Sequence, residues 1–217
     1  MWYNGYSAMK KIGVFGGTFN PVHRGHEITA LEFYDKFSLD KLLIMPSNIP
    51  PHKKNETEVS PKNRLEMCEL CFGKHRGRDI QVSDIEIKKE GVSYSFETLA
   101  ALKEIYPGDL IYFLVGSDMF LSIECWHRYE ELLEMCVFAV AFRRSGETER
   151  GEVAKLRETL TKRGYEIELL ENAAFEISST KLREKIKNRD FEGIGEYISP
   201  EVSDYIKEKK IYVLQQK

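Results

Sequence analysis

The sequence has no run of about 18 apolar residues, the length that a membrane-spanning helix needs. Its first eleven residues lack a basic end followed by an apolar stretch, so we expect no signal peptide and a cytoplasmic protein. A strong basic excess is also missing. The formal net charge is −3, which argues against a nucleic-acid surface as the main function of the chain. We therefore expect no membrane or nucleic-acid partner, whereas a small anionic substrate would need only a local positive site.

Cysteine is scarce, with 4 residues in 217. Only Cys68 and Cys71 have a spacing typical of metal ligands, and both fall in a helical pattern with Leu65 and Phe72. Cysteines three residues apart in such a pattern are more often buried small side chains than ligands. We therefore predict no protein metal site.

Two common nucleotide-binding motifs are absent as well. The chain has neither a Gly-x-Gly-x-x-Gly turn after its first apolar run nor a Gly-Lys-Ser/Thr loop, which argues against dinucleotide dehydrogenases and P-loop enzymes. No repeat or low-complexity tract appears, and the length suits one medium domain. We expect a single domain over residues 9–217, preceded by an N-terminal extension of residues 1–8.

Short apolar runs alternate with amphipathic segments along the chain. Buried strands are predicted at 12–15, 41–46, 110–115, 137–142 and 167–170, and a shorter alternating strand within 79–87. Ile28, Leu31 and Tyr34 recur at three-residue spacing after Pro21, which predicts the first helix, and Ser60-Pro61 is typical of a helix start. This alternation predicts an α/β fold, a Rossmann-like open parallel sheet with helices on both faces.

The most informative stretch is 16–26, directly after the first apolar run. Gly16 and Gly17 would let the backbone turn tightly and approach an anion closely, and Pro21 suits the entry to a helix. His23 and His26 would share one face at the helix N-terminus, where unpaired N–H groups and the helix dipole favour an anion. We predict a phosphate site, although such turns also occur without ligands, and two such histidines could be metal ligands or surface residues.

Two later segments carry similar chemistry. Ser178, Ser179 and Thr180 would lie with Arg183 at the start of a helix, which is ordinary capping chemistry and also a second candidate anion site. Gly116 and Asp118 follow the 110–115 strand at its carboxyl end, where open α/β sheets bind ligands; the alternative there is a simple turn.

These motifs resemble those of a known family. Gly-Thr-Phe-x-Pro-x-His-x-Gly-His at 17–26 and Ile-Ser-Ser-Thr-x-x-Arg at 177–183 are similar to the two signatures of the nucleotidyltransferases related to class I aminoacyl-tRNA synthetases. One departure is Asn20, where the family usually has Asp. Asn keeps an acceptor oxygen but loses the charge, which puts a metal role for this position in doubt.

Within that family the chain resembles the bacterial nicotinate-mononucleotide adenylyltransferases over roughly residues 9–217. Their Pro-Pro-His-Lys loop, here 50–53, covers the triphosphate, which implies that Lys53 contacts phosphate; by itself the loop could simply be solvated. The resemblance also implies a pyridine-nucleotide site with Trp126 stacked on the ring, formed by Ser93, Tyr94, Ser95, Thr98 and Trp126. The alternatives for these residues are a helix cap and core filling.

The implied reaction transfers AMP from ATP to nicotinate mononucleotide, forming deamido-NAD and pyrophosphate. The attacking 5′-phosphate is already ionised at neutral pH, so the protein needs no general base and has to align two polyanions. The resemblance gives catalytic phosphate contacts to His23, His26 and Arg183. It assigns ATP and phosphate binding to Gly16, Gly17, Thr18, Phe19, Lys53, Gly116, Asp118, Ser178, Ser179 and Thr180.

A Mg²⁺ ion held mainly by the ATP phosphates and water is also implied, and a homo-oligomer is left open.

Two alternative functions are considered beside this one. One is an adenylyl- or cytidylyltransferase for another phosphate acceptor, such as phosphopantetheine or glycerol phosphate. The other is a nucleotide-binding regulator without turnover, against which the intact His23, His26, Lys53 and Arg183 argue.

Overall fold

The computed structural model describes residues 8–48, 59–75, 77–89, 94–142, 147–171, 178–188, 190 and 192–212. Its strands are β1 (Lys11–Gly17), β2 (Lys41–Pro46), β3 (Ile80–Val82), β4 (Leu110–Gly116), β5 (Val137–Ala141) and β6 (Ile167–Leu170). The α-helices are α1 (Arg24–Lys36), α2 (Pro61–Phe72), α3 (Ile85–Lys88), α4 (Ser95–Ile105), α5 (Ser117–Phe120), α6 (Tyr129–Met135), α7 (Glu147–Lys162), α8 (Ser179–Lys187) and α9 (Pro200–Glu208). Two 3₁₀ turns, η1 (Ile123–Cys125) and η2 (Glu192–Ile194), complete the described elements.

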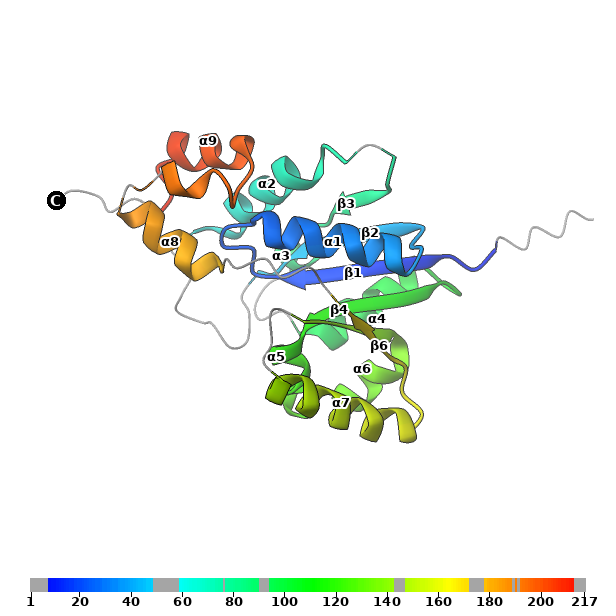
Figure 1. The fold of residues 1–217 in the computed structure, drawn as a ribbon. Helices are drawn as coiled ribbons and strands as arrows, with labels where there is room; N and C mark the ends of the chain where they lie inside the picture. The colour runs from blue at the N-terminus through cyan, green and yellow to red at the C-terminus, as the bar shows by residue number, and fades with distance from the viewer. Residues whose placement is uncertain are drawn as a thin grey trace, which may run out of the picture.

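The strands form one parallel sheet in the order β3-β2-β1-β4-β5-β6. The chain starts in the middle, runs outward through β2 and β3, and then crosses back to β4 on the other side of β1 (Figure 1). This reversal makes the carboxyl ends of β1 and β4 the topological switch point, where ligands of such sheets bind. The predicted fold class is confirmed.

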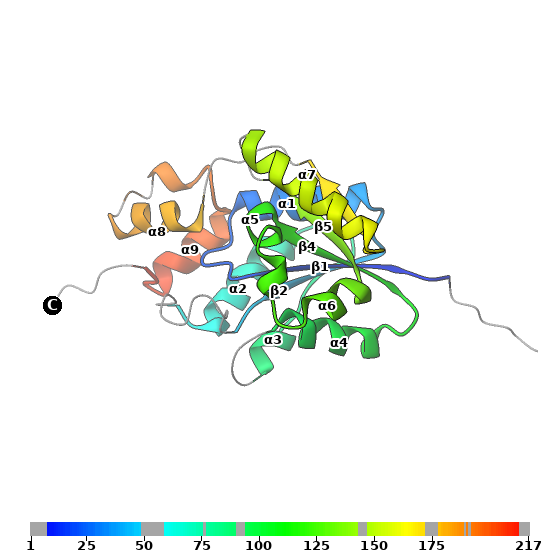
Figure 2. The same ribbon diagram turned by 90° about the horizontal axis from the view of Figure 1, so that it is seen from below.

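Along β2 and β5, alternate residues belong to two separate cores. Ile12 and Val14 of β1 pack in one core with α4, α6 and α7, whereas Leu42 and Ile44 of β2 pack in the other with α1, α2, α8 and α9. Figure 1 shows α1, α2 and α9 above the central strands and α4, α6 and α7 below them, and Figure 2 gives the view from below. Burial on both faces explains why the strands are nearly continuous apolar runs.

One local prediction was confirmed only in part. The segment 79–87 is a strand only over Ile80–Val82, and Ile85–Lys88 is helical, so the apolar and polar alternation overstated the strand. In α1 the most buried face carries Glu27, Ala30 and Phe33, whereas Ile28, Leu31 and Tyr34 are only half-buried. Glu27 can occupy that face because its carboxylate pairs with the Lys74 and His75 side chains at 3.0 and 2.9 Å.

Cys68 and Cys71 are buried side chains in the core around α2. Burial raises the pKa of Cys71 to about 12 and raises that of Cys68 well above its usual range. Within the described part of the chain, no three His, Cys, Asp or Glu residues form a group that could hold a metal ion.

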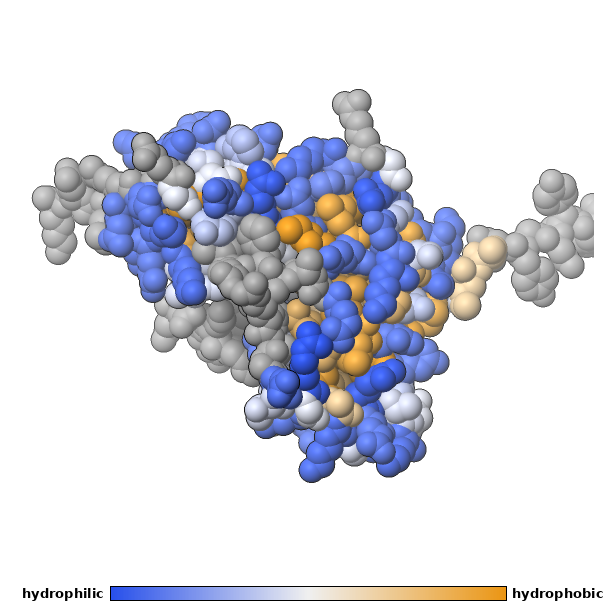
Figure 3. Space-filling model, in the orientation of Figure 1, coloured by the Kyte–Doolittle hydropathy of each residue, from blue (hydrophilic) through white to orange (hydrophobic). Residues whose placement is uncertain are grey.

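Among the helices of the described residues, none has the length and apolar character of a membrane span. Figure 3 shows apolar side chains between hydrophilic ones on one face, an ordinary surface for a globular protein.

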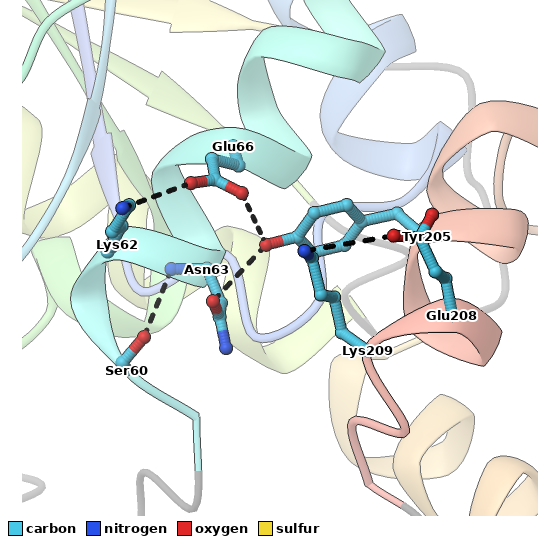
Figure 4. Close-up of polar contacts among 7 residues, drawn as sticks. All are labelled: Ser60, Lys62, Asn63, Glu66, Tyr205, Glu208 and Lys209. Atoms are coloured by element: carbon cyan, nitrogen blue, oxygen red, sulfur yellow. Dashed lines mark hydrogen bonds and ion pairs between the residues drawn. The ribbon is translucent and has the colours of Figure 1, made fainter.

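The C-terminal helix α9 is attached to α2 by a polar contact (Figure 4). The Tyr205 hydroxyl donates to Glu66 Oε2 at 2.6 Å and lies 3.2 Å from Asn63 Oδ1. Ser60, as predicted, caps α2 by accepting from the Asn63 N–H at 3.2 Å. Burial and the neighbouring Glu66 carboxylate raise the pKa of Tyr205, which keeps its phenol a donor.

Candidate active site

Residues 18–23, which we call the phosphate loop after the role predicted from the sequence, connect β1 with α1. Gly16 and Gly17 lie in the last part of β1, so the expected glycine turn is wrong; the positive φ in this region, 47°, belongs to Phe19. What Gly17 permits is close packing, because a Cβ there would lie 3.1 Å from the Phe19 ring. Pro21 follows a cis peptide bond and lies within the loop, three residues before the first helical residue.

His23 and His26 are together at the helix start, as predicted. His23 is the N-cap of α1 and is only 5% exposed, and the centroids of the two imidazole rings lie 3.7 Å apart. The His23 backbone N–H donates to His26 Nδ1 at 3.2 Å. Because Nδ1 accepts, a neutral His26 ring carries its hydrogen on Nε2, which makes Nε2 a donor at the positive end of α1.

The second motif contacts the phosphate loop directly. Ser179 Oγ donates to the Pro21 carbonyl oxygen at 3.0 Å, and Arg183 Nη1 donates to the Asn20 carbonyl oxygen at 2.8 Å. Arg183 Nη2 also donates to Thr180 Oγ1 at 3.1 Å. Ser178 caps α8 by accepting from the Lys181 N–H at 3.3 Å. The N-termini of α1 and α8 are therefore joined into one cationic and hydroxyl-rich site.

Arg64 of α2 was missed by the sequence reasoning. Its guanidinium is fully buried and donates from Nη1 to the Thr18 carbonyl oxygen at 2.8 Å and from Nη2 to the Asn48 carbonyl oxygen at 2.9 Å. It thus joins the loops that follow β1 and β2. Burial lowers the pKa of Arg64, which nevertheless stays charged at neutral pH. An arginine within the apolar stripe of Met67 and Cys68 was the signal that could have identified it.

The carboxyl end of β4 lies beside that of β1, which brings Gly116 and Asp118 to the same edge of the sheet. A Cβ at Gly116 would lie 2.5 Å from Asp118 Oδ1, so the carboxylate lies against the Gly116 backbone. Ser117 is buried and Asp118 is exposed. Both predicted residues are thus at the switch point.

The residues expected near the pyridine nucleotide have different environments. Thr98 is only 2% exposed and its hydroxyl donates to Glu86 Oε1 at 3.0 Å. This hydroxyl is therefore buried in the protein interior. Tyr94 is exposed, with its ring centroid 4.9 Å from that of His127. Trp126 is half-buried with its ring edge-on to Phe113.

Ser95 begins α4 and is half-buried. Lys53 and Ser93 lie outside the described residues. The structure therefore brings together the two phosphate motifs with Gly116 and Asp118, and groups Tyr94 beside the segment that carries Trp126.

Comparison with known proteins identifies the family of the chain. The family model described as cytidylyltransferase-like matches residues 14–185, so the chain belongs to that family of nucleotidyltransferases. A curated relative, the nicotinate-nucleotide adenylyltransferase of Bacillus subtilis, is 34% identical over 205 residues, which cover 94% of this chain and 99% of the relative. Within its family, the chain belongs with the nicotinate-nucleotide adenylyltransferases.

Solved structures show the same fold. Nicotinic acid mononucleotide adenylyltransferase of Plasmodium falciparum complexed with APC has a TM-score of 0.73 and 20% identity, covering 94% of this chain and 97% of that chain. The same enzyme complexed with NaAD has a TM-score of 0.73 and 21% identity, with the same coverage. At this identity the likeness supports the fold alone.

Proposed function

We propose that the chain transfers AMP from ATP to nicotinate mononucleotide, forming deamido-NAD and pyrophosphate. The observation that carries the proposal is the direct contact between the two phosphate motifs, in which Arg183 and Ser179 of α8 hold the carbonyl oxygens of Asn20 and Pro21. This contact lies at the β1 and β4 switch point, and the chain belongs with enzymes named for this activity.

The reaction needs alignment more than proton transfer. An oxygen of the 5′-phosphate attacks the α-phosphorus of ATP, the bond from that phosphorus to the oxygen bridging it to the β-phosphorus breaks, and pyrophosphate leaves with the electron pair. The nucleophile is already an anion at neutral pH, so a general base is unnecessary. The protein has to hold two polyanions in line and stabilise the charge that develops on the α and β oxygens.

Each motif supplies donors for that charge. His26 offers Nε2–H, and His23 lies with it at the positive end of α1. Thr18 and the adjoining glycine backbone line the α-phosphate, and Thr180 and Arg183 take the β and γ phosphates. A guanidinium has five N–H donors, so Arg183 can hold the Asn20 carbonyl and still donate to a phosphate.

Mg²⁺ is proposed as the ion that travels with ATP. The described residues offer no acidic or histidine cluster for it, and the Asn20 side-chain oxygen already accepts a hydrogen bond from Tyr212. The ion would therefore be held by phosphate oxygens and water, where it neutralises charge on the triphosphate.

We place the pyridine ring against Trp126, with Tyr94 and Ser95 beside it, and Lys53 over the triphosphate. A pocket of backbone donors would favour the nicotinate carboxylate over the amide, since a carboxylate presents only acceptors. An amide would put a donor against a donor and leave buried polar groups unpaired, a loss of about 1–3 kcal/mol for each contact. The cytoplasmic location stays a prediction, and the oligomeric state stays open.

The test is pyrophosphate release from purified protein with a panel of substrates. ATP and CTP are each combined with nicotinate mononucleotide, nicotinamide mononucleotide, phosphopantetheine or glycerol phosphate. We expect the highest kcat/KM with ATP and nicotinate mononucleotide. With nicotinamide mononucleotide, kcat/KM should be lower by about 10-fold or more. A higher kcat/KM with another acceptor would replace the proposed substrate. No release with any pair, together with measurable ATP binding, would support the regulator alternative.

A further inference from the structure

Tyr212 follows α9 at the end of the described chain and reaches back to the phosphate loop. Its hydroxyl donates to Asn20 Oδ1, although the two residues are 192 positions apart in the sequence. Both residues are 5% exposed. The amide oxygen can only accept, so the phenol is the donor of this bond. Because the pair is buried, losing the hydroxyl would leave a carbonyl oxygen without this donor in a site that water cannot easily enter.

Asn20 also connects the loop to α8. Its side-chain oxygen accepts from Tyr212, while its backbone oxygen accepts from Arg183 Nη1 at 2.8 Å. The preceding residue, Phe19, has a φ of 47°, a region that side-chain-bearing residues seldom adopt. Such a conformation persists where the surroundings hold it in place. The C-terminal part of the chain therefore contacts Asn20 twice, through Tyr212 at the side chain and through Arg183 at the backbone.

We propose that Tyr212 is a positioning residue for the phosphate loop, acting through Asn20. Its hydrogen bond fixes the Asn20 side chain, and thereby the peptide carbonyl that Arg183 holds and the path of the chain from Thr18 to His23. The proposal rests on the proposed adenylyl transfer for its kinetic effect. An amide side chain suits this role. Asn20 accepts the phenol hydrogen bond without placing a negative charge in the buried loop beside the phosphates.

The test compares two tyrosine variants that each lose one hydroxyl. Y212F removes the bond to Asn20, whereas the matched control Y205F removes the bond from α9 to Glu66, which lies on α2 (Figure 4). We expect Y212F to lower kcat/KM for ATP about 2- to 12-fold, the size expected for one neutral hydrogen bond. The KM for nicotinate mononucleotide should change less than 2-fold, because its proposed pocket belongs to other segments. Y205F should leave both constants within about 2-fold of native, whatever it does to the melting temperature.

A double-mutant cycle tests whether the effect passes through Asn20. In an N20A background the effect of Y212F on kcat/KM for ATP should be clearly smaller than in the native background, because the Asn20 side-chain oxygen is already gone. Calorimetric titration with ATP measures the same weakening as an increase in Kd. ATP binding can be measured without nicotinate mononucleotide. It therefore separates failure of this proposal from failure of the proposed reaction.

Three results would overturn the positioning role. They are native ATP kinetics and affinity in Y212F, equal losses in Y212F and Y205F, and an undiminished Y212F effect in the N20A background. Should N20A fail to fold, the comparison of Y212F with Y205F still decides the question, because each of those variants removes a single oxygen atom.

Discussion

Arg183 and Asn20 lie 163 residues apart in the sequence and are joined by a 2.8 Å hydrogen bond from Nη1 to the backbone carbonyl oxygen. The bond connects the start of α8 with the loop at the start of α1. An arginine that the motif predicts as a phosphate ligand therefore also holds the backbone of the loop that would cradle the phosphates. Its planar fork permits both, since one edge can hold a carbonyl while other N–H groups face an anion.

Arg183→Lys should impair the reaction strongly. An ammonium keeps the charge but cannot contact the Asn20 carbonyl, Thr180 and a phosphate in one fixed plane. We expect kcat/KM for ATP to fall about 10- to 100-fold, the range for hydrogen bonds to charged groups. The control is Lys185→Ala on the same helix, which breaks only an exposed pair with Asp190 and should leave kcat/KM within about 2-fold. A silent Arg183→Lys variant would remove α8 from the phosphate site.

His26→Ala should lower turnover while the protein stays folded. In the proposed reaction its Nε2–H donates to the charge that develops in the transition state, and removal of one preorganised donor typically costs about 10²–10³ in kcat. Steady-state pyrophosphate release measures the change, and far-UV circular dichroism checks the fold. His75→Ala is the control, because His75 follows α2 and contacts Glu27 Oε1 of α1, so its loss should affect stability more than kcat. Turnover near native in His26→Ala would contradict the phosphate-cradle interpretation.

Arg64→Met should destabilise the protein. The thioether fills part of the space but leaves the carbonyl oxygens of Thr18 and Asn48 without their donors. At about 1–3 kcal/mol for each of these two carbonyl groups, we expect the free energy of unfolding to fall by about 2–6 kcal/mol in urea denaturation. Arg78→Met removes an exposed pair with Asp35 and should cost far less. Equal losses in the two variants would mean that the buried bridge adds nothing beyond a surface ion pair.

Alkaline pH should reduce stability through the buried thiols. The pKa of Cys71 is raised to about 12 in the fold against about 8.5 in an unfolded chain, so above pH 8.5 the unfolded state releases a proton that the folded state keeps. Stability is therefore full below pH 8.5 and is lost as the pH rises toward 12. This thiol alone should cost about 2 kcal/mol between pH 8.5 and 10.

Urea denaturation at the two pH values measures that loss. Cys71→Ala should reduce the loss by about that amount relative to native protein. Cys125→Ala, which removes an exposed thiol, should leave it unchanged. The same loss in Cys71→Ala as in native protein would show that this thiol does not titrate differently in the two states.

The sequence predicted the structure best where the structure of a segment depends mainly on its own residues. The run 41–46 is a strand with those bounds, and Ser60 and Pro61 begin a helix, because burial of an apolar run and capping depend on neighbours in the chain. It was least informative where a residue's role depends on another segment. The buried face of α1 carries Glu27, since the Lys74 and His75 side chains allow this carboxylate to lie inward, and the spacing of apolar residues within the helix does not show this.

The sequence alone determined the fold class, the membership in a nucleotidyltransferase family and the two motifs, since residue type and spacing carry each of them. Only the tertiary structure decided what holds these motifs in place. The donors to the loop at Thr18, Asn20 and Pro21 come from Arg64, Ser179, Arg183 and Tyr212. A buried carbonyl needs a hydrogen-bond donor, but which distant side chain provides it depends on how the sheet brings the ends of the chain together, and no local pattern encodes that.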